Sequence, residues 1–80
     1  MTSAQCRAAR AMLGMTQSQL AEKSRLGLST VVDFEKARRQ VSPDVLHAIR
    51  RALERSGIQF ISENGGGRGV RLKKSNEKKD

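Results

Sequence analysis

Apolar residues recur every three or four positions through residues 3–56, which is the spacing of helices with one buried face. Ser3 is the predicted N-cap of the first helix and Gly14 its stop, and Thr16 opens a capping box at the start of the second. Ser42-Pro43 places a proline at the first position of the last helix. The pattern therefore predicts four helices, over residues 3–13, 16–24, 30–36 and 43–56.

The spacing changes to short β-type runs after Gly57. Residues 58–61 and 70–73 are predicted strands, and the glycine-rich stretch between them predicts a hairpin whose turn centres on Asn64-Gly65. Residues 74–80 contain no apolar residue, so we expect a disordered basic tail there. The predicted organisation is a helical domain over residues 1–57, a hairpin over 58–73 and the tail over 74–80.

Two short helices with a tight break between them have the geometry of a helix-turn-helix, in which one helix crosses DNA phosphates while the next lies in the major groove. That groove is ~12 Å wide and admits a single helix. Such a unit needs apolar anchors on both helices, and the sequence supplies Leu20, Ala21, Leu26, Val31 and Phe34. The residues left facing outward are Gln17, Leu28, Ser29, Val32, Asp33 and Lys36.

Length and composition limit the classes of function that the chain can have. The chain has 80 residues, 36% of them hydrophobic, and a net charge of +8, which fits one small domain with an acidic partner, either nucleic acid or an anionic surface. A chain this short buries only about 60% of its unfolded surface, so a deep active site is not expected. We predict no enzyme and no cofactor, and one cysteine with one histidine predicts no metal site.

The positive charge is unevenly distributed along the chain. Residues 1–35 carry +1 (four cations, three anions), 36–57 carry +4 (six, two) and 58–80 carry +3 (six, three). Most of the excess positive charge therefore lies after the helix predicted over residues 30–36, which would enter the major groove. Arg50, Arg51 and Arg55 are interpreted as solvent-exposed cations on the outer face of the last helix. No apolar run opens the chain, so neither a signal peptide nor a membrane-spanning helix is expected and the predicted location is the cytoplasm.

In the two short helices and the helix that begins at Pro43, the chain resembles the Cro/C1-type (XRE) helix-turn-helix family of phage and bacterial repressors. The resemblance lies in Thr16-Gln17-x-x-Leu20-Ala21-Glu22-Lys23, in Val31-x-x-Phe34-Glu35-Lys36 and in the helix from Pro43, and it covers roughly residues 6–57. It implies a mainly α fold, a lambda-repressor-like domain of four to five helices. Here the C-terminal β-hairpin replaces the fifth helix that many relatives use for pairing.

The resemblance also implies roles for individual residues. Gln17 stands where family members hold a DNA phosphate with the side chain and the helix N-terminus. Arg10 and Glu35 stand where the family has a structural ion pair. The first residues of the third helix, and one a turn later, would face base edges. The implied DNA-binding set is Thr16, Gln17, Ser18, Leu28, Ser29, Thr30, Asp33, Lys36, Arg38 and Arg39.

Several positions depart from the family pattern. Relatives usually have Gly where Arg25 stands and a Ser or Thr cap where Gly27 stands, so the turn is expected to be shifted or locally different. No Arg, Asn or Gln occupies a reading position, so bidentate base contacts are not predicted. Sequence reading is expected to depend on thymine methyl contacts from Leu28, single bonds from Ser29 or Thr30, a cytosine contact from Asp33, and DNA shape.

The predicted hairpin has two interpretations. It can close the small core with Phe60 and Leu72, or its open edge can pair with a second copy of the chain. We favour the second, since a dimer supplies the core that eighty residues lack. The dimerisation residues predicted on this basis are Ile58, Phe60, Val70 and Leu72.

Together these features predict a homodimeric, sequence-specific transcription regulator, a repressor or activator of bacterial or mobile-element genes, that binds an inverted-repeat operator in double-stranded DNA. The alternative is an antitoxin-like or anti-activator-like module on the same scaffold. That module would hold another regulatory protein through the hairpin or through the apolar surface of Leu28 and Val32. No membrane partner is expected.

Overall fold

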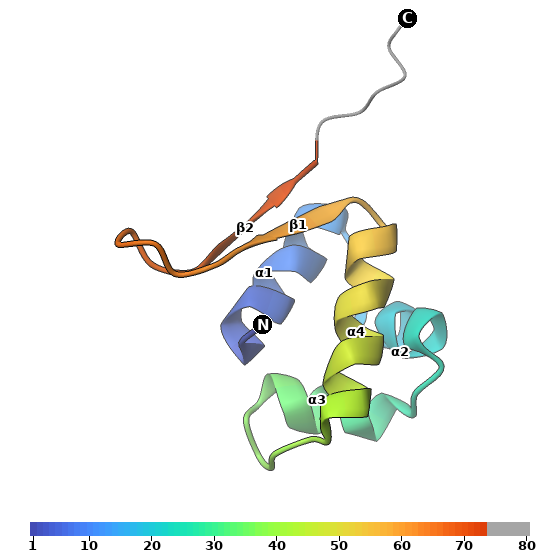
Figure 1. The fold of residues 1–80 in the computed structure, drawn as a ribbon. Coiled ribbons are helices and arrows are strands. Elements are labelled where there is room, and N and C mark those ends of the chain that lie inside the picture. Colours follow the sequence, from blue (N-terminus) through green and yellow to red (C-terminus); the bar gives the residue numbers. More distant parts are fainter. Residues whose placement is uncertain (74–80) are drawn as a thin grey trace, which may run out of the picture.

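The protein folds into four helices followed by a two-stranded antiparallel hairpin in this computed structural model, which describes residues 1–73 (Figure 1). The elements are α1 (Ser3–Leu13), α2 (Gln17–Ser24), α3 (Leu28–Glu35), α4 (Pro43–Arg55), β1 (Ile58–Ile61) and β2 (Gly69–Leu72). The mainly α fold with a C-terminal hairpin is therefore confirmed. The tail predicted over residues 74–80 lies outside the described residues.

The cap of α1 is Thr2 and not Ser3. The Thr2 hydroxyl accepts a hydrogen bond from the Gln5 N–H (3.1 Å), and the Gln5 side-chain oxygen accepts one from the Thr2 N–H (2.8 Å). This reciprocal arrangement needs Glu or Gln three residues after the cap, which Thr2 has and Ser3 lacks. The Ser3 hydroxyl instead donates to the Phe34 carbonyl (2.7 Å) and ties the start of α1 to α3.

The turn between α2 and α3 is made by Arg25 and Gly27, the two positions that depart from the resemblance. Arg25 ends α2 in the left-handed conformation (φ 60), which is normally left to glycine. Gly27 is the N-cap of α3 and offers no side-chain bond, but its carbonyl accepts from the Thr30 N–H (3.1 Å). The third helix begins at Leu28, two residues before the predicted start.

The core lies where α4 meets the other helices. In Figure 1, α4 runs through the middle of the molecule with α1 and α2 on either side and α3 at one end. Four of the five predicted anchors are buried, and Leu26 is half-buried at its rim. The buried apolar residues are Cys6, Ala9, Met15, Leu20, Ala21, Val31, Phe34, Ile49, Ala52, Leu53 and Ile58.

The predicted hairpin is confirmed, and it packs on the helices. Ile58 pairs with Leu72 and Ile61 with Gly69, so residues 62–68 form the connection and no two-residue Asn-Gly turn is made. This register places Ile58, Phe60, Val70 and Leu72 on one face, whereas a one-residue slip would turn one strand's apolar side chains outward. The Gln5 side-chain amide donates to the Gly69 carbonyl (2.9 Å) and fixes the hairpin to α1.

Candidate nucleic-acid interface

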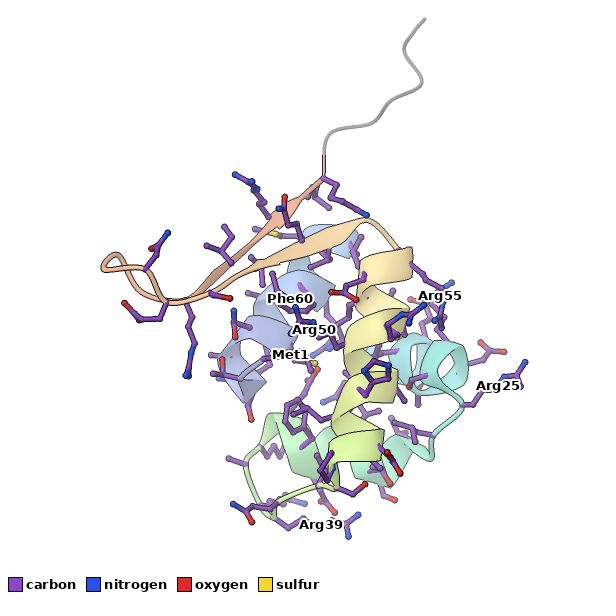
Figure 2. All side chains as sticks on the ribbon, in the orientation of Figure 1. Met1, Arg25, Arg39, Arg50, Arg55 and Phe60 are labelled. Atoms are coloured by element: carbon purple, nitrogen blue, oxygen red, sulfur yellow. The ribbon has the colours of Figure 1, made fainter. Side chains whose placement is uncertain are left out.

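The residues predicted to bind DNA gather at the end of the molecule formed by α3, the start of α2 and the loop between α3 and α4. Thr16, Ser18, Leu28 and Ser29 are exposed, and Gln17, Thr30 and Asp33 are half-buried. Lys36, Arg38 and Arg39 are exposed in the loop after α3, and Figure 2 places Arg39 at that extremity. The structure therefore brings the ten residues to one end of the chain's fold.

The Glu35 carboxylate holds this end together from the inside. Glu35 is 1% exposed, and its two oxygens accept hydrogen bonds from Arg10, from Nε at 2.6 Å and from Nη2 at 2.7 Å. The Gln17 amide donates to the same carboxylate (3.0 Å), and the Cys6 thiol lies 3.2 Å from it. Arg7 donates to the Glu35 carbonyl. One buried carboxylate thus connects α1, α2 and the end of α3.

Burial and hydrogen bonding set the ionisation of this group. Burial on its own raises the pKa of the Glu35 carboxyl, but hydrogen bonds from Arg10, Gln17 and Cys6 favour the charged form, and the net result is a lowered pKa. The hydrogen bond to Glu35 raises the pKa of Arg10. Burial, followed by the hydrogen bond to Glu35, raises the pKa of the Cys6 thiol, so Cys6 stays a neutral core residue.

Gln17 gains a fixed orientation from this network. An amide nitrogen carries two N–H donors, and Gln17 uses one on Glu35. The second donor and the N-terminus of α2 remain available to an anion outside. Arg10 also donates to the Met15 carbonyl (2.9 Å) in the turn before α2. The buried pair therefore positions the first residues of α2 relative to α3.

Asp33 faces the loop arginines. Its carboxylate lies 3.7 Å from Arg38 and 3.3 Å from Arg39, and the two arginine side chains are 59% exposed. Ala37 adopts a left-handed conformation (φ 55), and the Arg38 N–H donates to the Asp33 carbonyl (2.9 Å), which turns the loop back over α3. Exposed ion pairs of this kind contribute at most about 1 kcal/mol, so a phosphate can displace Asp33 from either arginine.

The four predicted dimerisation residues differ in their surroundings. Ile58 is 1% exposed and belongs to the core of its own chain. Phe60 and Val70 pack partly against that core, and the Arg50 guanidinium lies over the Phe60 ring at 5.2 Å from its centroid (Figure 2). Leu72 is 52% exposed. The apolar face of the hairpin is thus turned mainly to the helices, and Leu72 is the member left at the surface.

Some contacts of the site could not be predicted from the sequence. Arg7 and Cys6 reach Glu35 only because α1 packs on α3, and the Asp33 contacts depend on the left-handed turn at Ala37. Apolar spacing along α1 does not show that the buried Cys6 faces Glu35. Within residues 1–73 no three His, Cys, Asp or Glu side chains cluster as metal ligands, and no helix there is long and apolar enough to cross a membrane.

Comparison with known proteins agrees with this geometry. A family model described as helix-turn-helix matches residues 7–60, which is more than half of the chain. The match runs from α1 through the start of the hairpin and includes both α2 and α3. No curated protein matches the chain significantly in sequence.

Proposed function

The chain belongs to the Cro/C1-type (XRE) helix-turn-helix family of DNA-binding transcription regulators, and from this premise we propose that it binds an inverted-repeat operator as a homodimer. The proposal includes its place of action, the cytoplasm, and its effect, repression where the operator overlaps a promoter. The observation that carries it is the buried Glu35 network, which joins α1, the start of α2 and the end of α3 and so sets the two helices of the unit relative to each other.

Phosphate contacts would fix the protein on the duplex. Gln17 and the N-terminus of α2 offer hydrogen-bond donors, and the exposed cations of the loop after α3 offer charge. Thr16 and Ser18 flank Gln17 and add hydroxyl groups at the same end. We assign Lys36, Arg38 and Arg39 to phosphates, where their contribution would be independent of base sequence.

Base reading falls to the start of α3. Leu28 is 46% exposed and suits a thymine methyl group, while Ser29 and Thr30 supply single hydrogen bonds. Asp33 can accept from a cytosine amino group only when it releases Arg38 and Arg39, so we assign it first to the orientation of those arginines. Shape and deformability of the operator would supply the remaining selectivity.

Dimerisation is assigned to the outer edge of β2. The Lys73 N–H donates to the Gly57 carbonyl (2.8 Å), and hydrogen-bonded pairs alternate along an antiparallel ladder. The backbone groups of Val70 and Leu72 therefore point away from β1, where a second copy can pair with them. Leu72 is exposed beside that edge, and binding to an inverted repeat requires the two-fold related pair to set its two α3 helices about 34 Å apart, one turn of DNA.

Selection of bound sequences from random duplex DNA at near-physiological salt tests the proposal. We expect enrichment of an inverted repeat with half-sites one helical turn apart, protected symmetrically in a footprint. Enrichment of a single half-site would remove the dimer, and no enrichment would favour the module that captures a regulatory protein.

A pair of variants separates these outcomes from poor folding. Arg38→Ala/Arg39→Ala should weaken binding to the selected operator and to random duplex alike, so that less DNA is recovered, while the chain stays folded by circular dichroism because both side chains are exposed. Arg68→Ala/Lys73→Ala removes the same charge from the hairpin and should enrich the same operator as the unaltered chain.

A further inference from the structure

A second group of cations lies away from the DNA-facing end, around a hollow of about 320 Å³ between α2 and α4. The exposed side chains of Lys23 and Arg25 line it from the end of α2, and those of Arg51 and Arg55 line it from α4. Its remaining lining residues are Ser24, His47 and Ala48. Figure 2 shows Arg25 and Arg55 at the right of the molecule and Arg39 at its lower end. We call this group the basic hollow.

The four permanent charges of the basic hollow have no anionic partner among residues 1–73. The ion pairs of that part of the chain join Arg10 to Glu35, Arg50 to Glu54, and Asp33 to the loop arginines. Glu54 is therefore engaged on another face of α4, and no acidic residue lines the hollow. Four like charges around one recess repel one another, and an anionic ligand would relieve that repulsion.

Helix-dipole and backbone effects explain only some of the four cations of the basic hollow. Lys23 lies in the last turn of α2 and Arg55 in the last turn of α4, where a cation gains about 0.3–1 kcal/mol from the helix dipole. Arg51 has no such role. Arg25 occupies a left-handed position (φ 60) where glycine would relieve about 1–2 kcal/mol of strain, so the backbone does not explain its side chain.

The α4 wall of the basic hollow lies away from the end where α3 would meet a duplex. α4 begins at Pro43 beside the DNA-facing loop and runs away from it. At 1.5 Å per residue, Arg51 and Arg55 lie about 12 and 18 Å further along the helix axis than Pro43. These cations are thus available while the phosphate contacts proposed above are made, and they need a different acidic partner.

We propose that the basic hollow is a docking site for an acidic segment of another protein, one that presents consecutive Asp or Glu side chains. Ser24 and Ala48 form a small-residue floor, and arginines on both walls can grip one carboxylate from two sides, since the guanidinium fork matches a carboxylate. A recess of this volume holds a few side chains, whereas a second duplex would meet the molecule with a broad convex surface. Arginine clusters are a known mode of acidic-motif recognition.

Fluorescence anisotropy with a labelled oligoglutamate peptide of about ten residues tests the proposal on the full chain. Arg51→Glu/Arg55→Glu should raise the peptide Kd at least tenfold. Arg68→Glu/Lys73→Glu changes the net charge equally on the hairpin and should leave the Kd within about twofold. Arg38→Glu/Arg39→Glu should also leave it unchanged, which separates this site from the proposed DNA contacts.

Three outcomes would overturn the proposal. Equal loss in all three variants would show that net charge alone attracts the peptide. Loss confined to Arg38→Glu/Arg39→Glu would place the peptide on the DNA-facing end. A non-operator duplex that competes for the hollow, and loses affinity in Arg51→Glu/Arg55→Glu as much as the peptide does, would make it a DNA site. Peptide-induced amide shifts in the unaltered chain, expected at residues 23–25 and 47–55, check the position without any substitution.

Discussion

At the residue scale, the left-handed backbone at Arg25 (φ 60) makes a direct prediction about stability. Replacement by glycine relieves about 1–2 kcal/mol of strain and gives back about 0.4–1 kcal/mol because glycine is freer in the unfolded chain. Arg25→Gly should therefore raise the free energy of unfolding by about 1 kcal/mol, measured as a higher urea midpoint. Lys23→Gly, inside α2, should lower it by about the same amount. A fall in both variants would mean that Arg25 is not strained.

Glu35 makes the second residue-scale prediction. Its folded pKa lies below the ordinary 4.5, so its contribution to stability is complete above pH 4.5 and is lost as the pH falls below that value. The variant used for comparison is Arg10→Met/Glu35→Leu, in which apolar side chains replace the ion pair with little change in the free energy of unfolding. We expect the stability difference between the unaltered chain and this variant to shrink between pH 5 and pH 3 in urea titrations.

A single substitution in the pair tests the same network at neutral pH. Arg10→Met alone leaves the buried carboxylate without its main partner and should cost about 3–5 kcal/mol, a large share of a small domain's stability. If Arg10→Met were as stable as the double variant, the charge of Glu35 would be satisfied without Arg10.

At the element scale, the hairpin is both a lid on the core and the proposed dimer edge, and two substitutions separate these roles. Ile58→Ala empties a site that is 1% exposed and should lower the free energy of unfolding by about 2–5 kcal/mol. Leu72→Asp lies at a half-exposed position, so the monomer should lose under about 1 kcal/mol while dimerisation fails. Sedimentation equilibrium measures the molar mass and so distinguishes monomer from dimer. A dimeric Leu72→Asp chain would place the interface elsewhere.

The helices and strands show which parts of the fold can be predicted from the sequence and which cannot. Helix spans were predictable because apolar spacing and capping boxes are local features, and Thr16 with Gln19 forms the predicted box. The start of α3 was missed because Gly27 caps it through its backbone alone. The hairpin was predictable from its two apolar runs, but its register was not, because the Asn64-Gly65 pair forms no two-residue turn and Gln5 of α1 holds the Gly69 carbonyl. The candidate DNA-binding residues came from a family pattern, whereas the basic hollow arises only when α2 packs on α4.

At the scale of the whole molecule, two groups of cations contribute to the net charge of +8 and have different proposed tasks, the loop after α3 and the basic hollow. Each phosphate neutralised at a DNA interface contributes ~0.9 to the slope of log K against log salt concentration. A cation elsewhere adds to the long-range field, which added salt screens beyond about 8–10 Å. The salt dependence of DNA binding therefore reports which cations touch the duplex.

Two double variants that remove the same charge make this quantitative. Arg38→Ala/Arg39→Ala should reduce the magnitude of the slope by about 1.8 and weaken specific and non-specific duplexes alike, since phosphates carry no sequence information. Arg51→Ala/Arg55→Ala should leave the slope within about 0.3 of the unaltered value, because its side chains face the basic hollow and not the duplex. Filter binding over a salt series measures both. Equal slope changes in the two variants would mean that the duplex contacts both groups, and that the phosphate-binding surface extends along α4.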